Sequence, residues 1–92
     1  MRRRASDAQP KRGDCVEVSW IDITEDPTGD PDTATLMRRT SVGLFWARRL
    51  DKGVEVVVTT TTRDSNGAFQ AGYCVYPASC IVSMRIIKRG VA

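Results

Sequence analysis

The sequence contains no histidine, and this absence removes several kinds of catalytic and metal site. Serine–histidine and cysteine–histidine nucleophile pairs both need an imidazole as the general base. Imidazole is also the commonest side-chain ligand of protein-bound metals. The absence therefore removes much of hydrolytic chemistry. Because no other catalytic constellation is visible in the sequence, we expect no enzymatic activity, no bound metal and no cofactor.

Cysteines and long apolar runs are also scarce. The three cysteines, Cys15, Cys74 and Cys80, are odd in number and lack the C-x-x-C spacing of a zinc site. We expect them to be small, buried apolar residues in a reducing compartment. No stretch approaches the roughly eighteen apolar residues of a membrane span, and no apolar run follows the basic start as in a signal peptide. These features predict a cytosolic protein without membrane contact.

The net charge of +3 is unevenly distributed along the chain. Residues 1–13 carry five basic and one acidic side chain, a net charge of +4, whereas residues 14–92 carry nine basic and ten acidic side chains, a net charge of −1. The first twelve residues are also polar and without periodicity. We therefore expect a flexible basic arm over residues 1–12, dispensable for folding, and a single folded domain over residues 13–92.

The residues that are present favour β-structure throughout the folded part. Residues 54–62 are nearly all β-branched and contain neither glycine nor proline, which predicts a strand in the interior of a sheet. Residues 15–21 alternate, so that Val16, Val18 and Trp20 share one face. This stripe predicts a half-buried first strand with Trp20 in the core.

Turn residues separate further strands. An acidic loop over residues 22–39 contains two prolines and a glycine, with a short helical turn expected near residues 33–37. Gly43 indicates a bend or a close backbone approach. Residues 50–53 read as a tight turn, and Asn66–Gly67 is a strong hairpin signal. The remaining strands are expected over residues 40–47, 71–76 and 81–87.

The order of these elements predicts the fold class. A long first loop, two tight hairpins and a short 3₁₀ turn over residues 77–80 connect five strands. A small antiparallel meander usually curls or closes to hide its edge strands. We therefore predict an all-β fold, a small five-stranded SH3-like barrel. Because residues 81–87 are apolar on both faces, we also expect a homo-oligomer.

Turns of a meander alternate between two ends of the molecule, and this predicts where charge collects. The chain end at Lys88 and Arg89 is expected beside the acidic loop. The opposite end should gather residues 77–80 and a group of cations next to an indole ring. Guanidinium groups suit phosphate, and an aromatic face can stack on a base. The candidate anion-binding residues are Lys11, Arg12, Arg48, Arg49, Lys52 and Trp46.

Three short motifs form a recurring set: V-x-V-x-W-x-D at residues 16–22, S-V-G at residues 41–43, and Y-P-x-x-C-I-x-S at residues 76–83, with Ile87 four residues later. The set resembles small uncharacterised accessory proteins of tailed bacteriophages. Those often carry V-x-W-x-D near the start, S-V-G in the middle and P-x-x-x-I-x-x-I at the end. The resemblance implies a protein that works in the host bacterial cytoplasm by binding, as a host-modulating or anti-defence factor.

Three classes of function therefore remain open. The first is a non-catalytic module that binds a host protein or a nucleotide second messenger. The second is a nucleic-acid-binding module that uses the basic arm and the basic end. The third and least favoured is an enzyme, because no catalytic constellation is visible in the sequence.

Overall fold

The computed structural model describes residues 9–23 and 28–90, and its strands form one antiparallel sheet. The elements are β1 (Cys15–Asp22), η2 (Pro31–Thr33), β2 (Met37–Asp51), β3 (Val54–Asp64), β4 (Phe69–Pro77), η3 (Ala78–Cys80) and β5 (Ile81–Lys88), where η marks a 3₁₀ turn. The strand order across the sheet is β4-β3-β2-β1-β5. The all-β prediction is confirmed, and the β-branched strand β3 lies inside the sheet as expected.

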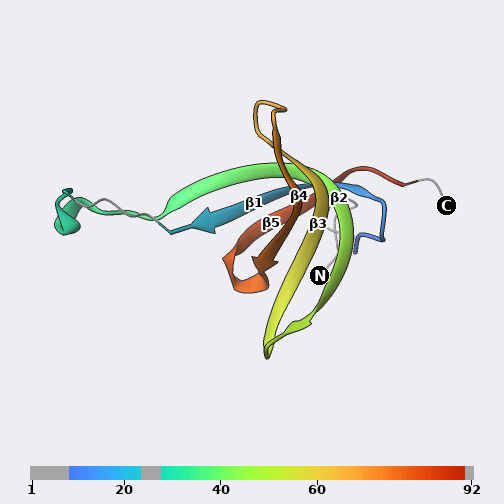
Figure 1. Ribbon diagram of the computed structural model, residues 1–92, viewed down its shortest axis with the longest axis horizontal. Coiled ribbons are helices and arrows are strands. Elements are labelled where there is room, and N and C mark those ends of the chain that lie inside the picture. Colours follow the sequence, from blue (N-terminus) through green and yellow to red (C-terminus); the bar gives the residue numbers. More distant parts are fainter. Residues whose placement is uncertain (1–8, 24–27, 91–92) are drawn as a thin grey trace, which may run out of the picture.

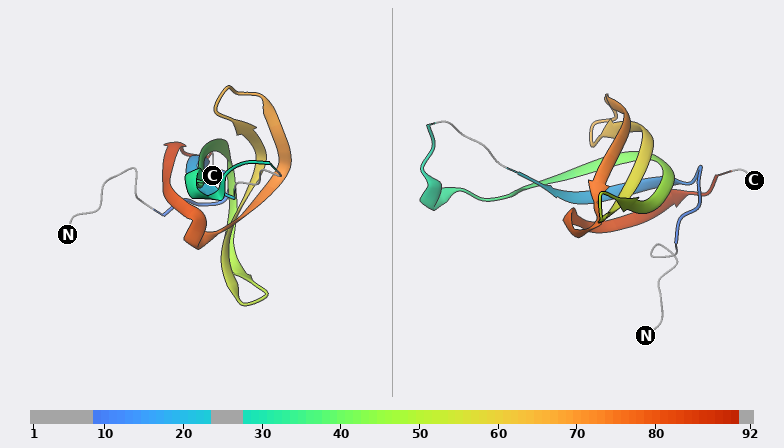
Figure 2. Two further views of the ribbon diagram at one scale, coloured as in Figure 1. Left: turned by 90° about the vertical axis from the view of Figure 1, so that its left-hand side faces the viewer. Right: turned by 60° about the horizontal axis from the view of Figure 1, so that its bottom comes forward.

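The sheet curls strongly but does not close (Figure 1). Strand β2 bends, pairing with β1 over residues 37–44 and with β3 over residues 41–51. Strands β4 and β5 are the outer strands, and they do not pair with each other. The five strands and the curl agree with the prediction, but the sheet is not closed into a barrel. The single turn η3 carries the chain from β4 to the far side of β1, instead of folding β5 back alongside β4 (Figure 2).

The bend of β2 depends on a close backbone approach at Gly43, as the sequence indicated. A Cβ atom at this position would lie 3.0 Å from the carbonyl oxygen of Thr60 and 3.2 Å from the hydroxyl of Thr62. Opposite Gly43, β3 contains an extra residue, and Thr61 adopts a φ of 50°. This β-bulge brings the buried hydroxyls of Thr59 and Thr62 within 3.0 Å of each other.

Both predicted hairpins are present. Lys52 and Gly53 have φ values of 52° and 82°, the left-handed pair that a two-residue hairpin turn requires. In the next hairpin Gly67 has a φ of 83°. There the carboxylate of Asp64 accepts hydrogen bonds from the amides of Asn66 and Ala68 at 2.9 and 3.0 Å. Local turn chemistry thus determines both connections.

The helical turn of the acidic loop begins earlier than predicted. It spans Pro31–Thr33, and Met37 already belongs to β2. Asp30 caps this turn, because its side chain accepts a hydrogen bond from the amide of Asp32 at 3.0 Å. Pro31 supplies the fixed φ that suits a first helical position. The loop extends well away from the curled sheet (Figure 1).

The core lies inside the curl. Its buried residues are Val16, Val18, Phe45, Val57 and Tyr76. The side chains that pack against them and are partly buried are Trp20, Cys74, Ile81, Met84 and Ile86. The predicted face of the first strand is confirmed, with Trp20 at the rim of the core. No described residue belongs to a helix with the length and apolar character needed to cross a membrane.

The apolar side chains of β5 are divided between the core and the surface. Met84 pairs with Val18 and Ile86 pairs with Val16, so both face the core. Val82 and Ile87 are extra residues at two register shifts, and they are 49% and 43% exposed. The bulges change the alternation of side chains, so Val82 does not share the core-facing side of Met84 and Ile86.

Candidate functional site

An apolar hollow of about 360 Å³ lies between the end of β1 and strand β4, which the sheet does not pair. Residues 20–23 form one wall. Gln70, residues 74–77 and Cys80 form the other wall. The hollow therefore occupies the open mouth of the curled sheet, a position where β-proteins commonly bind ligands.

Two aromatic side chains meet at the base of this hollow. The ring centroids of Trp20 and Tyr76 are 5.5 Å apart at an interplanar angle of 68°, an edge-to-face contact. Tyr76 is only 3% exposed, and its hydroxyl oxygen has no hydrogen-bond partner of good geometry, although Thr59 and Ser41 lie close to it. Burial raises the pKa of the Tyr76 phenol, so the group is neutral and presents an apolar ring.

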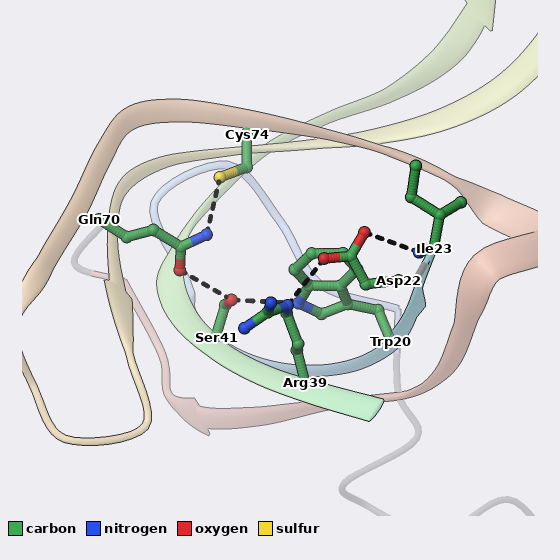
Figure 3. Close-up of polar contacts among 7 residues, drawn as sticks. All are labelled: Trp20, Asp22, Ile23, Arg39, Ser41, Gln70 and Cys74. Atoms are coloured by element: carbon green, nitrogen blue, oxygen red, sulfur yellow. Dashed lines mark hydrogen bonds and ion pairs between the residues drawn. The ribbon is translucent and has the colours of Figure 1, made fainter. Parts of the chain in front are cut away.

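A chain of polar contacts orients the walls (Figure 3). The indole Nε1–H of Trp20 donates to the hydroxyl of Ser41 at 3.1 Å, and that hydroxyl donates to Oε1 of Gln70 at 3.1 Å. The amide nitrogen of Gln70 lies 4.0 Å from the sulfur of Cys74. These groups satisfy one another, so they hold the indole in place and leave the apolar surfaces to face the hollow.

The rim combines a neutralised ion pair with an exposed apolar side chain. Nε of Arg39 donates to Oδ2 of Asp22 at 2.7 Å, and the amide of Ile23 donates to Oδ1 of Asp22 at 2.8 Å. Ile23 itself is 71% exposed. The site thus presents apolar surface without an uncompensated charge. A larger hollow of about 700 Å³ is lined by residues 29–31 and 33–36 of the acidic loop and by the first two residues of β2, so no other strand supplies a second wall.

At the opposite end of β1, a buried carboxylate joins the two ends of the described chain. Asp14 is 3% exposed, and its side chain accepts hydrogen bonds from the amide of Lys11 at 2.9 Å and the amide of Gly90 at 2.7 Å. The guanidinium of Arg89 donates to the same carboxylate at 3.0 Å. The backbone amides of Lys11 and Gly90 hold the pKa of Asp14 below its ordinary value, and Arg89 adds to this effect.

The candidate anion-binding residues lie in two groups. Arg12 and Trp46 are brought together: the guanidinium carbon lies 4.0 Å from the centroid of the indole ring, and Nε donates to the Trp46 carbonyl oxygen at 3.0 Å. Lys11 is adjacent in sequence and exposed, while its amide binds Asp14. The contact between Arg12 and Trp46 is a cation–π pair, and it attaches residues 11–12 to the sheet.

The second group lies along the β2–β3 hairpin. Arg48 forms an ion pair with Glu55 at 2.7 Å, and Arg49 and Lys52 are exposed. The structure therefore places Arg48, Arg49 and Lys52 on one hairpin, but it partly neutralises the first of them.

The ends of the molecule differ from the expected arrangement. Cys15 pairs with Lys88, so Lys88 and Arg89 lie beside Lys11 and Asp14 instead of beside the acidic loop. Pro77 pairs with Val56 near the β2–β3 turn, as expected, but Trp20 pairs with Ile81, so η3 also lies near the end of β1 that leads into the acidic loop. Because η3 does not reverse the chain, the turns do not alternate between two ends as in a simple meander.

The predicted arm is described only in its last part. Pro10 is buried, and residues 11 and 12 make the contacts given above. Residues 1–8 of the arm lie outside the described residues.

A search of protein-family models, of curated proteins and of solved structures found no match to this chain. Within residues 9–23 and 28–90, no cluster of three or more cysteine, aspartate or glutamate side chains could hold a metal ion.

Sequence reasoning did not find the hollow or the buried carboxylate. Trp20 and Tyr76 were each assigned to a strand, but their contact joins β1 to β4 across the curl. The signal available was weak: Trp20 ends an apolar stripe, and Tyr76 precedes a proline. No sequence pattern around Asp14 indicates its burial, because it depends on Arg89 and Gly90. These two residues lie 75 and 76 positions further along the chain.

Proposed function

We propose that this protein is a non-catalytic binding module whose site is the hollow between β1 and β4. The observation that supports this most directly is the apolar character of the hollow together with the exposed side chain of Ile23 at its rim. The polar side chains around it bind one another, so they serve to position the walls. An open apolar surface of this kind suits an apolar side chain presented by a partner protein.

The finer description of the fold is part of the same proposal. The strand order, the long loop between β1 and β2 and the 3₁₀ turn between β4 and β5 support an SH3-like architecture that stays open at one seam. Small β-folds of this type commonly carry a binding function on their surface, and the fold alone does not define the ligand.

The biological setting is also a proposal, and it rests on the sequence motifs. Their resemblance to accessory proteins of tailed bacteriophages supports a factor that acts in the host bacterial cytoplasm. In that setting the partner is a host protein, and binding serves to modulate the host or its defence.

The binding proposal can be tested with a yeast-displayed library of short random peptides. Peptides selected by the wild-type chain should be enriched in large apolar or aromatic residues. Ile23→Glu should weaken their binding by at least about tenfold, because a carboxylate would have to be desolvated against the bound apolar side chain. The measurement is fluorescence anisotropy of a labelled selected peptide.

Leu50→Glu is the matched control, since Leu50 is 72% exposed, as Ile23 is 71% exposed, but lies on the β2–β3 hairpin and not in the hollow. It should leave peptide binding unchanged. Equal losses for the two variants, or a selection that recovers no apolar motif, would contradict the proposal.

A second candidate function is the binding of an anionic ligand, either a nucleotide messenger or a nucleic acid. The observation that favours it is the guanidinium of Arg12 over Trp46, with Lys88 and Arg89 on the same side of the molecule. Together with the cations of the β2–β3 hairpin, these residues offer charge for phosphates and an aromatic face for a base.

Two double charge reversals test this second candidate. Arg48→Glu with Arg49→Glu should abolish binding to a panel of cyclic nucleotides and short oligonucleotides, whereas Arg38→Glu with Arg39→Glu should have little effect. The pairs are matched, because each reversal breaks one ion pair, Arg48–Glu55 or Arg39–Asp22. Oligonucleotide affinity should also fall steeply with salt. Equal losses would indicate diffuse electrostatics without a site, and loss only for the second pair would place the site elsewhere.

A further inference from the structure

The two edges of the open sheet are protected to different degrees. Native sheets usually guard an exposed edge with charged side chains, bulges or proline, because its unpaired backbone groups can pair with another strand. Strand β5 carries Arg85 and Lys88 and contains bulges at Val82 and Ile87. These features make β5 a poor template for a further strand.

Strand β4 lacks the first of these protections. None of its nine residues is charged. A register shift makes Gln70 an extra residue, and Pro77 ends the strand, so the regular part before the proline runs over residues 71–76. Within that part Tyr73 is 68% exposed and Val75 is 41% exposed. A neutral, apolar edge of this kind favours strand pairing.

We infer that β4 is the surface on which two copies of this chain associate, by antiparallel pairing of β4 with β4 of a second copy about a two-fold axis at Tyr73. A second copy fits better than a charged partner, because a charged side chain would lose its solvent against Tyr73 and Val75, whereas two neutral edges bury no charge. The same self-pairing along β5 would place arginine and lysine side chains of both copies close to each other. Strand β4 also forms one wall of the hollow, so this pairing would lie beside the proposed binding site, but the inference rests on the exposed edge and not on binding in the hollow.

The side chains of β4 are self-complementary in this register. Tyr73 would face its counterpart, and Val75 would face Ala71 of the second copy. Cross-strand aromatic and apolar pairs stabilise antiparallel sheets. Leu44, Thr60 and Tyr73 already form one row across β2, β3 and β4, and Leu44 is 40% exposed. The pairing would extend this row without interruption from one copy into the other.

Analytical ultracentrifugation of the full chain in reducing buffer tests the inference. The wild type should sediment with the mass of two chains at tens of micromolar concentration. Tyr73→Lys should sediment as one chain, because it places two like charges directly opposite each other at the two-fold axis. The side chain of Tyr73 is mostly exposed, so circular dichroism should show an unchanged fold.

Val82→Lys is the matched control on the other edge, at a position that is 49% exposed. It should leave the dimer intact. As a second measurement, Tyr73→Cys should form an intermolecular disulfide under mild oxidation, and Val82→Cys should not. A wild type that sediments as one chain, a Tyr73→Lys variant that remains dimeric, or a dimer that only Val82→Lys disrupts would overturn the inference.

Discussion

Replacing Asp14 by asparagine should lower the melting temperature at pH 7 by several degrees or more. The carboxylate accepts hydrogen bonds from the amides of Lys11 and Gly90 and from the guanidinium of Arg89, at 2.9, 2.7 and 3.0 Å. An asparagine side chain offers one acceptor oxygen, and its amide group would face these donors with donors of its own. The substitution therefore removes the link between the two ends of the described chain.

The same carboxylate predicts how stability depends on pH. The pKa of Asp14 in the folded protein is lowered, chiefly by the backbone amides of Lys11 and Gly90. A lowered pKa contributes stability at every pH above the value of the unfolded chain, about 3.9, and this contribution is lost as the pH falls through the folded value. The difference in melting temperature between wild type and Asp14→Asn should thus be full at pH 6–7 and should shrink below about pH 4.

Differential scanning calorimetry over a pH series measures this effect. Asp51→Asn is a suitable control, because Asp51 is an exposed carboxylate at the β2–β3 turn. It should leave the melting temperature almost unchanged. If Asp14→Asn were as stable as the wild type at neutral pH, or if the difference persisted undiminished in acid, the carboxylate would not have this role.

The second large effect is expected for Trp20→Ala, which should reduce the free energy of unfolding by about 3 kcal/mol. Trp20 packs against the core, contacts Tyr76 edge to face and donates a hydrogen bond to the buried hydroxyl of Ser41. We expect the lower end of the range for a buried tryptophan, because Trp20 lies at the rim. A loss of this size is still a large share of the roughly 5–14 kcal/mol available to a domain of this length.

Urea unfolding followed by circular dichroism measures this loss. Trp46→Ala is the matched control: Trp46 is 44% exposed, and its indole ring contacts the guanidinium of Arg12. It should cost less than about 1 kcal/mol. The loss of unfolding free energy for Trp20→Phe should lie between the losses for Trp20→Ala and Trp46→Ala. Phenylalanine retains a ring against Tyr76 but loses the hydrogen bond to Ser41. Equal costs for the two alanine variants would show that Trp20 is not part of the core.

The features that depend on neighbouring residues could be predicted from the amino-acid sequence. Alternation placed Val16 and Val18 on one face, since successive side chains of a strand point in opposite directions. The left-handed conformations at Gly53 and Gly67 follow from glycine's lack of a Cβ atom, which also explains the close approach at Gly43. For this reason the five strands and both hairpins could be predicted.

The contacts between segments far apart in the chain could not be predicted in the same way. Whether the sheet closes depends on where η3 directs β5, and the chain joins β5 to β1 instead of β4. The pairing of β5 with β1 leaves the hollow beside Trp20 and places Arg89 next to Asp14. It also makes Val82 a bulge residue. Each of these contacts joins residues far apart in the sequence, and their geometry depends on the bend of β2 and on register shifts that no local pattern encodes.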